Sequence, residues 1–269
     1  MLSTLGHKLR PFLPAPVYRA LWTYAARRTA NRYLKSAGVF DLALQVAERF
    51  DGRVQSGVFK GMKYTRAAIL SRHATPMLIG QYERQIYDAL TAAASRVDTV
   101  IDIGHAEGYY AVGLALAGKR VIAFDSDPHE RRICREMAKE NGVPDRVSIR
   151  SWCSAKDLLA LTRAERALII SDIDGGEIDL FAPEVIADLQ HCDLIIELHA
   201  AVPEDNQPFV NRFLRTHHVE IIDHPRMPAG VELIAFLGAE APRMATEYRH
   251  VQQWMIASAK EGAVAPSRI

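Results

Sequence analysis

Five residues that can carry acid–base or metal chemistry follow two apolar runs in the second half of the sequence. Asp172, Asp174 and Glu177 come after ALIIS, and Glu197 and His199 close the run IIELH. If both runs are neighbouring parallel strands, their carboxyl ends meet at one rim and bring the five side chains together. Such a group suits removal of a proton from a hydroxyl, or coordination of a divalent cation.

Three of these residues are candidate catalytic groups. His199 is the first candidate for a general base, because imidazole has an ordinary pKa of about 6.5 and can be free at neutral pH. Asp174 is the second candidate, and Glu197 completes the set. In an alternative that we do not favour, Asp172, Asp174 and Glu197 bind Mg²⁺ or a similar ion. Simpler roles stay open, because Glu177 can start the following helix and Glu197 can pair with an arginine.

A second polar group lies in VIDIGHAEGYYAVGLA, where an apolar strand passes into a helix. Its glycines are spaced GxxxG, so the dinucleotide pattern GxGxxG is not met. This looser turn suits a ligand without phosphate, and Gly104 would let the backbone approach that ligand closely. We expect Asp102 or Glu107 to receive an ammonium group. The candidate cofactor-binding residues of the turn are Asp102, Gly104, His105, Glu107 and Gly108.

An acid ends the next apolar run as well. Asp125 closes VIAFD, where a carboxylate can accept hydrogen bonds from both hydroxyls of a ribose. Asp125, together with a turn that suits a ligand without phosphate, predicts an adenosine ligand that lacks a pyrophosphate, namely S-adenosylmethionine (SAM). Ser126 follows the acid, and Trp152 and Cys153 stand where an adenine ring would lie, although a buried tryptophan in the core is an equal alternative. Asp172 completes the candidate cofactor-binding set.

Strands and helices must alternate to position these residues. We expect strands near 98–103, 120–125, 146–151, 167–172 and 193–198, separated by helices as in βαβ units. Two further β-rich runs lie at 217–223 and 231–238, and the gap HPRMPAG between them is too short for a crossover helix. The sequence therefore predicts an α/β fold with a seven-stranded Rossmann-like sheet whose last two strands are antiparallel. His224, in that gap, would border the acceptor pocket.

Four segments in this order resemble the FkbM-type methyltransferases, a class I SAM-dependent family: VIDIGHAEGYYAVGLA, VIAFDSDP, ISDIDGGEIDLF and IIELH. The resemblance covers residues 80 to 240 and implies a class I methyltransferase sheet, SAM as the cofactor, and methylation of a hydroxyl on a saccharide or natural product. Asp174 stands where the family pattern DxEGxE has glutamate, and His105 replaces a more usual small or amide residue. Residues 1 to 60 match nothing in the family, so the acceptor is not identified.

Two other functions compete with O-methylation: an RNA methyltransferase that uses a basic amino-terminal arm, and a non-catalytic SAM-binding protein. No acidic residue precedes Asp41, whereas seven basic residues interleaved with aromatics do. Helices in this arm would cover the cleft or mediate contact in a homodimer. The net charge of +1 gives the molecule no strong pull toward nucleic acid, so a small-molecule or saccharide acceptor is favoured over RNA. The acidic cluster argues against a binding-only role.

Composition and length set the remaining expectations. With 49% hydrophobic and 24% charged residues, the chain has the composition of a soluble globule, and its three scattered cysteines predict a reducing compartment. No apolar run approaches the roughly 20 residues that span a bilayer, so we expect a cytoplasmic protein. A helix is expected at 75–96 and a hairpin at 53–66. The expected domains are a basic helical segment with a short hairpin (1–74), a SAM-binding domain (75–240) and a helix with a flexible tail (241–269).

Overall fold

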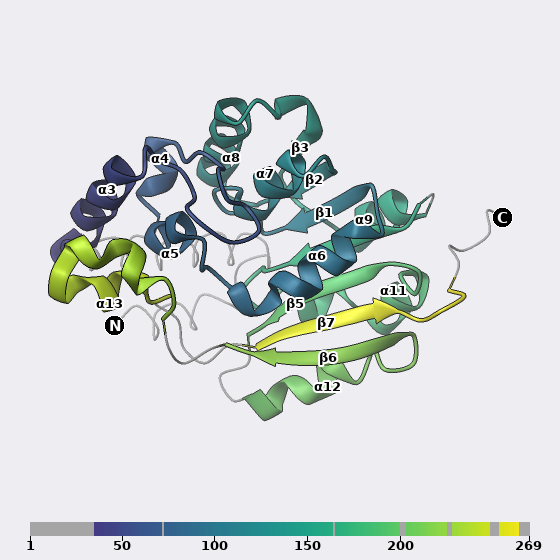
Figure 1. Cartoon of the computed structure of the whole chain (residues 1–269). Helices are drawn as coiled ribbons and strands as arrows, with labels where there is room; N and C mark the ends of the chain where they lie inside the picture. Colours follow the sequence, from purple (N-terminus) through teal and green to yellow (C-terminus); the bar gives the residue numbers. More distant parts are fainter. Residues whose placement is uncertain are drawn as a thin grey trace, which may run out of the picture.

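The computed structural model describes residues 35–71, 73–163, 165–199, 203–224, 228–247 and 253–263. Seven strands form one mixed sheet between two layers of helices (Figure 1). The strands are β1 (Thr99–Ile103), β2 (Arg120–Phe124), β3 (Val147–Arg150), β4 (Ala167–Ser171), β5 (Asp193–Leu198), β6 (His217–Asp223) and β7 (Gln253–Ala259).

The strand order is β3-β2-β1-β4-β5-β7-β6. Strands β1 to β5 pair in parallel, whereas β7 pairs antiparallel with both β5 and β6. The predicted fold is confirmed: the sheet is the Rossmann-like, seven-stranded sheet of class I methyltransferases, with an antiparallel last pair. The carboxyl ends of five parallel strands therefore share one edge, where ligands of open α/β sheets bind.

The central strands are apolar because helices cover both of their faces. Successive strand residues point to opposite faces, so Val100 packs in one hydrophobic cluster and Ile101 in the other. The first cluster includes residues of α6 (Tyr87–Ser95), α7 (Tyr109–Leu116) and α8 (Pro128–Glu140). The second includes residues of α9 (Ala155–Thr162), α10 (Glu177–Leu180), α11 (Pro183–Asp188) and α12 (Gln207–Val210). Short 3-10 turns lie at η3 (Pro144–Arg146) and η4 (Pro203–Asn206).

Four helices from distant parts of the sequence form a helical lobe beside the sheet. They are α3 (Val39–Arg49), α4 (Arg66–Ile69), α5 (Ala74–Ile79) and α13 (Ala241–Ala245). Helix α3 packs on α4, α5 and α13, and Figure 1 shows the group beyond the ends of the parallel strands. The lobe thus lies on the side of the sheet where a ligand is expected. The predicted basic arm, up to residue 34, lies outside the described residues.

The segment before β1 differs from the single helix expected at 75–96. Helix α5 ends at Gly80, which has a φ of 73°, and the chain resumes helical structure at η2 (Arg84–Ile86) and α6. A Cβ on Gly80 would lie 1.9 Å from the carbonyl oxygen of Ser56, so the close approach of two loops breaks the helix. The hairpin expected at 53–66 is reduced to one antiparallel bridge, between Arg53 and Lys63.

The strand expected at 231–238 is wrong. This segment lies in a 3-10 helix, η5 (Val231–Glu240), with glycines of positive φ at Gly230 and Gly238. Of its large apolar side chains, Phe236 is 48% exposed, so the segment could not fill a strand enclosed by neighbours. The seventh strand is β7, which lies between β5 and β6 and buries four consecutive residues on both faces.

The position of β7 also changes the expected carboxyl-terminal boundary. The sheet extends past residue 240, because α13 and β7 both come from the range assigned to a helix and flexible tail. The rest of the domain division stays a prediction. No helix in the described part of the chain is long and apolar enough to cross a membrane.

Candidate active site

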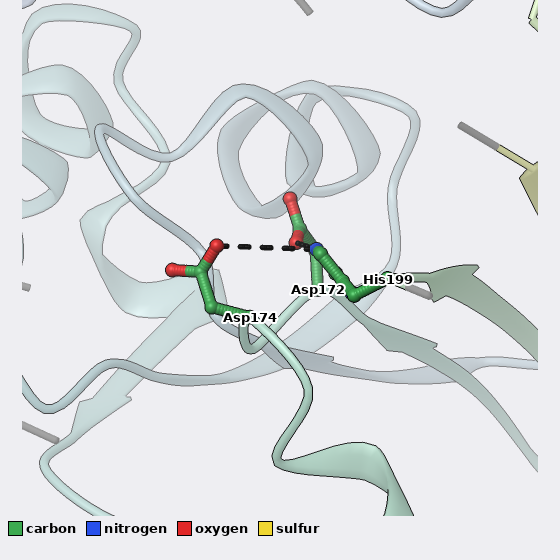
Figure 2. A group of neighbouring side chains, drawn as sticks. All are labelled: Asp172, Asp174 and His199. Carbon is green, nitrogen blue, oxygen red and sulfur yellow. Dashed lines mark ion pairs between the residues drawn. The ribbon is translucent and has the colours of Figure 1, made fainter. Parts of the chain in front are cut away.

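The acidic rim is formed where β4 and β5 end side by side. Ser171 of β4 pairs with Ile196 of β5, so the next residues, Asp172 and Glu197, lie next to each other on the same face. His199 follows β5 directly, and Figure 2 shows its imidazole pointing toward Asp172 and Asp174. We call Asp172, Asp174, Glu177, Glu197 and His199 the acidic rim.

His199 lies at the centre of the acidic rim. Its Nε2 is 3.2 Å from Oδ1 of Asp172, 3.4 Å from Oε2 of Glu197 and 3.9 Å from Oδ1 of Asp174. Its Nδ1 is 3.8 Å from Oε2 of Glu177. The predicted convergence of the five side chains is confirmed, whereas their catalytic roles stay predictions.

The acidic rim runs from the protein interior to the solvent. The side chains of Glu197 and Glu177 are buried, that of Asp172 is 32% exposed and that of Asp174 is 79% exposed. Asp174 has a φ of 53°, a left-handed conformation that is uncommon outside glycine and that clusters at functional sites. Glu177 closes the loop, because its Oε1 accepts a 2.6 Å hydrogen bond from the backbone N–H of Ile173. The loop thus holds one carboxylate inward and presents another outward.

The pKa values of the acidic rim follow from burial and from its excess of carboxylates. Burial lowers the pKa of His199, but the hydrogen bonds to Asp172 and Glu197 and the nearby charges outweigh it and raise the pKa to about 12. Burial raises the pKa of Glu177 to about 7, and burial with the charge of Asp172 holds the pKa of Glu197 well above its ordinary value. His199 is therefore an imidazolium at neutral pH in this arrangement, which opposes its expected role as the general base.

A further group of acids, which the sequence analysis missed, adjoins the acidic rim from the lobe. Glu83 is fully buried, accepts a hydrogen bond from the hydroxyl of Tyr110, and lies close enough to Asp172 and Glu197 for one oxygen of each to fall within 4.8 Å. Its backbone N–H donates to Oε1 of Glu247 at 2.8 Å. Burial and the charge of Glu197 hold the pKa of Glu83 well above its ordinary value.

His224 lies beside this inner group. Its Nε2 is 3.1 Å from Oε2 of Glu247. His224 therefore lies next to Glu247, the partner of Glu83. Its expected place at an acceptor pocket stays a prediction. No local motif in the sequence marks Glu83 or Glu247, because they come from loops that only the packing of the lobe brings together.

The glycines of the β1–α7 turn are required by contacts within the protein. Gly104 has a φ of 91°, and a Cβ there would lie 1.8 Å from the carbonyl oxygen of Asp172. Gly108 has a φ of 99°, and its Cβ would lie 2.7 Å from Sγ of Cys134. The turn therefore packs directly on the loop that carries the acidic rim, so the two candidate sites form one region.

Three ionisable residues of this turn are buried. Asp102 is 2% exposed, and its Oδ2 has no hydrogen-bond partner among the described residues. Burial, reinforced by the charges of Asp125 and Asp172, raises its pKa to about 8. Burial lowers the pKa of His105 to about 4, so its imidazole is neutral. Glu107 is buried as well.

Asp125 links the end of β2 to this turn. Its Oδ2 accepts a 3.0 Å hydrogen bond from the backbone N–H of Ala106, and its Oδ1 accepts a 2.7 Å bond from that of Asp127. A carboxylate has about four acceptor sites, so these two bonds do not exhaust its capacity to accept from the hydroxyls of a ribose. The backbone bonds hold this acid in place beside the turn.

The remaining candidates around the adenine position divide into exposed and buried residues. Trp152 is 45% exposed, so it does not lie in the core, and Ser126 is exposed. Cys153 is buried, and burial raises the pKa of its thiol to about 12, which leaves it unreactive. Among these residues, Trp152 alone offers a large exposed ring for stacking.

The residues present fit SAM. The unpartnered oxygen of Asp102 suits an ammonium group, Asp125 suits a ribose, and Trp152 suits an adenine ring. All three lie along the carboxyl edge of consecutive strands in the sheet.

Comparisons with known proteins do not show a family for this chain. No family model matches the chain, so the FkbM resemblance stays a prediction. A stretch of 55 residues is 34% identical to the O-antigen chain terminator bifunctional methyltransferase/kinase WbdD of Escherichia coli. That stretch is 20% of this chain and spans only 8% of the relative's length.

Solved structures with a similar course of the chain include methyltransferases. A putative O-methyltransferase from Klebsiella pneumoniae aligns at a TM-score of 0.43 and 14% identity, over 86% of this chain and 96% of its own. The bifunctional kinase-methyltransferase WbdD aligns at a TM-score of 0.43 and 18% identity, over 67% of this chain and 39% of its own. A precorrin 8W decarboxylase of Methanobacterium thermoautotrophicum aligns at a TM-score of 0.44 and 16% identity, over 64% of this chain and 87% of its own. At these scores, the similarities add nothing to what the strand order already establishes.

Proposed function

We propose that this chain is a SAM-dependent methyltransferase that methylates a hydroxyl of a small molecule or saccharide. The observation that carries the proposal is the contact between the β1–α7 turn and the acidic rim, with Asp172 packed on Gly104. This contact sets a fitting cofactor site directly beside groups that can handle a proton. The short stretch shared with WbdD, whose name states a methyltransferase, also supports methyl transfer.

The cofactor would be held by residues along three strand ends. Asp102 would take its ammonium group, Asp125 its ribose hydroxyls and Trp152 its adenine. When bound, the cofactor supplies a methyl group activated by a sulfonium. Because the β1–α7 turn packs on the β4 loop, the segment 172–176 that follows β4, the chain would orient that group toward the acidic rim.

Within the acidic rim, we assign proton acceptance to Asp174. Its carboxylate is the most exposed of the five residues and therefore the one that an acceptor hydroxyl can reach from solvent. His199 holds Asp172 and Glu197 in place through its Nε2 and is already protonated at neutral pH. We therefore place His199 as a positioning residue and Asp174 as the base.

Calorimetric titration with S-adenosylhomocysteine tests the cofactor site. We expect Asp125→Ala to weaken binding by about 1–3 kcal/mol, the cost of losing hydrogen bonds to a charged group. Asp145→Ala, which removes an exposed carboxylate beside β3, is the matched control and should bind as the wild type does. Absence of binding by the wild-type chain would refute the proposal. A screen of hydroxylated acceptors with methyl-labelled cofactor then tests the acceptor class.

A further inference from the structure

We propose that the acidic rim binds a divalent cation of the Mg²⁺ or Mn²⁺ class. The ligands would be Asp172, Glu197, His199 and one oxygen of Asp174, whose second oxygen would stay available to accept a proton. The ion would fix the acceptor through its hydroxyl oxygens. The use of the ion in catalysis rests on the proposed function, whereas its binding can be tested without any cofactor.

The ligand atoms lie at distances that suit a single ion. One oxygen of Asp172, one of Asp174 and one nitrogen of His199 all fall within 4.8 Å of one another. Nε2 of His199 is 3.2, 3.4 and 3.9 Å from oxygens of Asp172, Glu197 and Asp174. Around an octahedral ion with ligands at about 2.1 Å, adjacent ligands are about 3.0 Å apart and opposite ones about 4.2 Å. Measured from Nε2 of His199, the oxygens of Asp172 and Glu197 lie close to the spacing of adjacent ligands, and the oxygen of Asp174 lies closer to that of opposite ligands.

The other ring nitrogen of His199 faces a buried carboxylate, as it does in many metal sites. Its Nδ1 lies 3.8 Å from Oε2 of Glu177, whose side chain is 4% exposed and whose other oxygen is held by Ile173. A metal-bound histidine commonly directs its second N–H to a carboxylate, which fixes the ring and its tautomer. Binding of the ion would displace the proton that Nε2 carries in the metal-free structure, and the ion would then supply the positive charge between the carboxylate oxygens.

A further buried carboxylate lies on β1, outside the acidic rim. Asp102 is only 2% exposed, and its Oδ2 lacks a hydrogen-bond partner among the residues that the structure describes. It pairs in register with Ile170, which lies two residues before Asp172 on the same face of the sheet. Asp102, Asp172 and Glu197 thus lie on one face of three neighbouring strands. Asp102 is assigned to the ammonium group of the cofactor, and the ion would take Asp172 and Glu197.

The proposed ion also narrows the acceptor class. Four protein ligands around an octahedral ion leave about two positions, which a compound with two neighbouring hydroxyls can fill. Bound to the ion, such a hydroxyl has a lowered pKa. Asp174 is exposed, so an acceptor can reach the ion from solvent. We therefore infer that the acceptor is a vicinal diol.

Titration of the chelator-treated, full-length chain with Mn²⁺ alone, followed by electron paramagnetic resonance, tests the site. We expect one saturable Mn²⁺ per chain, and a loss of affinity of at least about 10-fold in Asp174→Asn and in His199→Gln. Asp174→Asn alters an exposed side chain, so it should not impair folding. The control is Asp188→Asn, an exposed carboxylate at the end of α11, which should bind as the wild type does.

Two results would overturn the inference: no saturable binding of Mn²⁺, or equal affinity in Asp174→Asn, His199→Gln and the wild type. A parallel titration with S-adenosylhomocysteine separates this failure from failure of the proposed function. If the nucleoside binds and Mn²⁺ does not, the cation site is refuted and the cofactor site stands. If Mn²⁺ binds and the nucleoside does not, the cation site is supported and the cofactor site fails.

Discussion

Replacement of Gly104 by alanine tests the contact that joins the β1–α7 turn to the acidic rim. The added Cβ would lie 1.8 Å from the carbonyl oxygen of Asp172, 2.8 Å from its carbonyl carbon and 3.0 Å from Cγ2 of Ile173. The first two of these atoms are backbone, so the side chains cannot simply turn away. Either the β1–α7 turn or the β4 loop must move.

Two costs add at this position. A side chain at a φ of 91° is strained by about 1–3 kcal/mol, and overpacking costs about a further 1–3 kcal/mol. Gly118 offers a matched control, since it has a φ of 89° and a Cβ added there would meet nothing within 4 Å. Gly118→Ala therefore carries the backbone cost alone. We expect Gly104→Ala to lower the free energy of unfolding by about 1–3 kcal/mol more than Gly118→Ala does.

Urea unfolding of both variants, followed by circular dichroism, measures this difference. Affinity for S-adenosylhomocysteine in the same variants shows whether the displaced loop matters for the ligand, and we expect Gly104→Ala alone to bind more weakly. Equal destabilisation of the two variants would show that the turn does not press on Asp172 in solution. The spatial link between the two halves of the site would then be refuted.

Three further perturbations test separate parts of the structure. Asp193 is buried and accepts hydrogen bonds from Arg96 and Arg166. Asp193→Ala should lower the free energy of unfolding by about 3 kcal/mol, as measured by urea unfolding. This is the low end of the cost of breaking a buried ion pair, because each arginine side chain is 40% exposed. Because the pKa of His199 is raised to about 12, its charged form stabilises the fold fully below pH 6.5, and this contribution is lost as the pH rises through about 12. ¹⁵N shifts of the metal-free protein should therefore show a doubly protonated imidazole ring at pH 8. Titration of the ring near pH 6.5 would contradict this. Trp152→Ala should weaken S-adenosylhomocysteine binding by about 1–3 kcal/mol in calorimetry, and unchanged affinity would remove Trp152 from the adenine site.

The central strands β1, β4 and β5 could be predicted because burial on both faces leaves a nearly continuous apolar run. The run ALIIS is apolar up to the serine that ends it, and TVIDI is buried throughout although it contains Asp102. The observed bounds of both strands lie within two residues of those expected. The seventh strand was missed for a related reason. QWMIASA mixes small and large residues without alternation, whereas the segment 231–238 has a stronger β-propensity and yet lies in a 3-10 helix. Insertion between two strands, a tertiary constraint, outweighed local propensity.

Site residues at the ends of the parallel strands could be predicted, whereas site residues that come from the helical lobe could not. Asp172 and Glu197 could be brought together because parallel neighbours end at one edge, and His199 follows from the same argument. Glu83 and Glu247 could not, since the hydrogen bond between them joins positions 164 residues apart. The pKa of His199 could not be predicted either, because it depends on burial and on the distances to Asp172, Glu197 and Glu177, which only the folded chain defines.

The division between sheet and lobe suggests which part of the molecule selects the acceptor. The sheet supplies the β1–α7 turn, Asp125 and the acidic rim, all fixed by strands that pack on both faces. Glu83 and Glu247 reach the same region from loops of the lobe, one before β1 and one between β6 and β7. Loops on a rigid scaffold can change without disturbing it. Substitutions at Glu83 should therefore alter the choice of acceptor more than affinity for the cofactor, because Glu83 lies against Asp172 and Glu197 of the acidic rim.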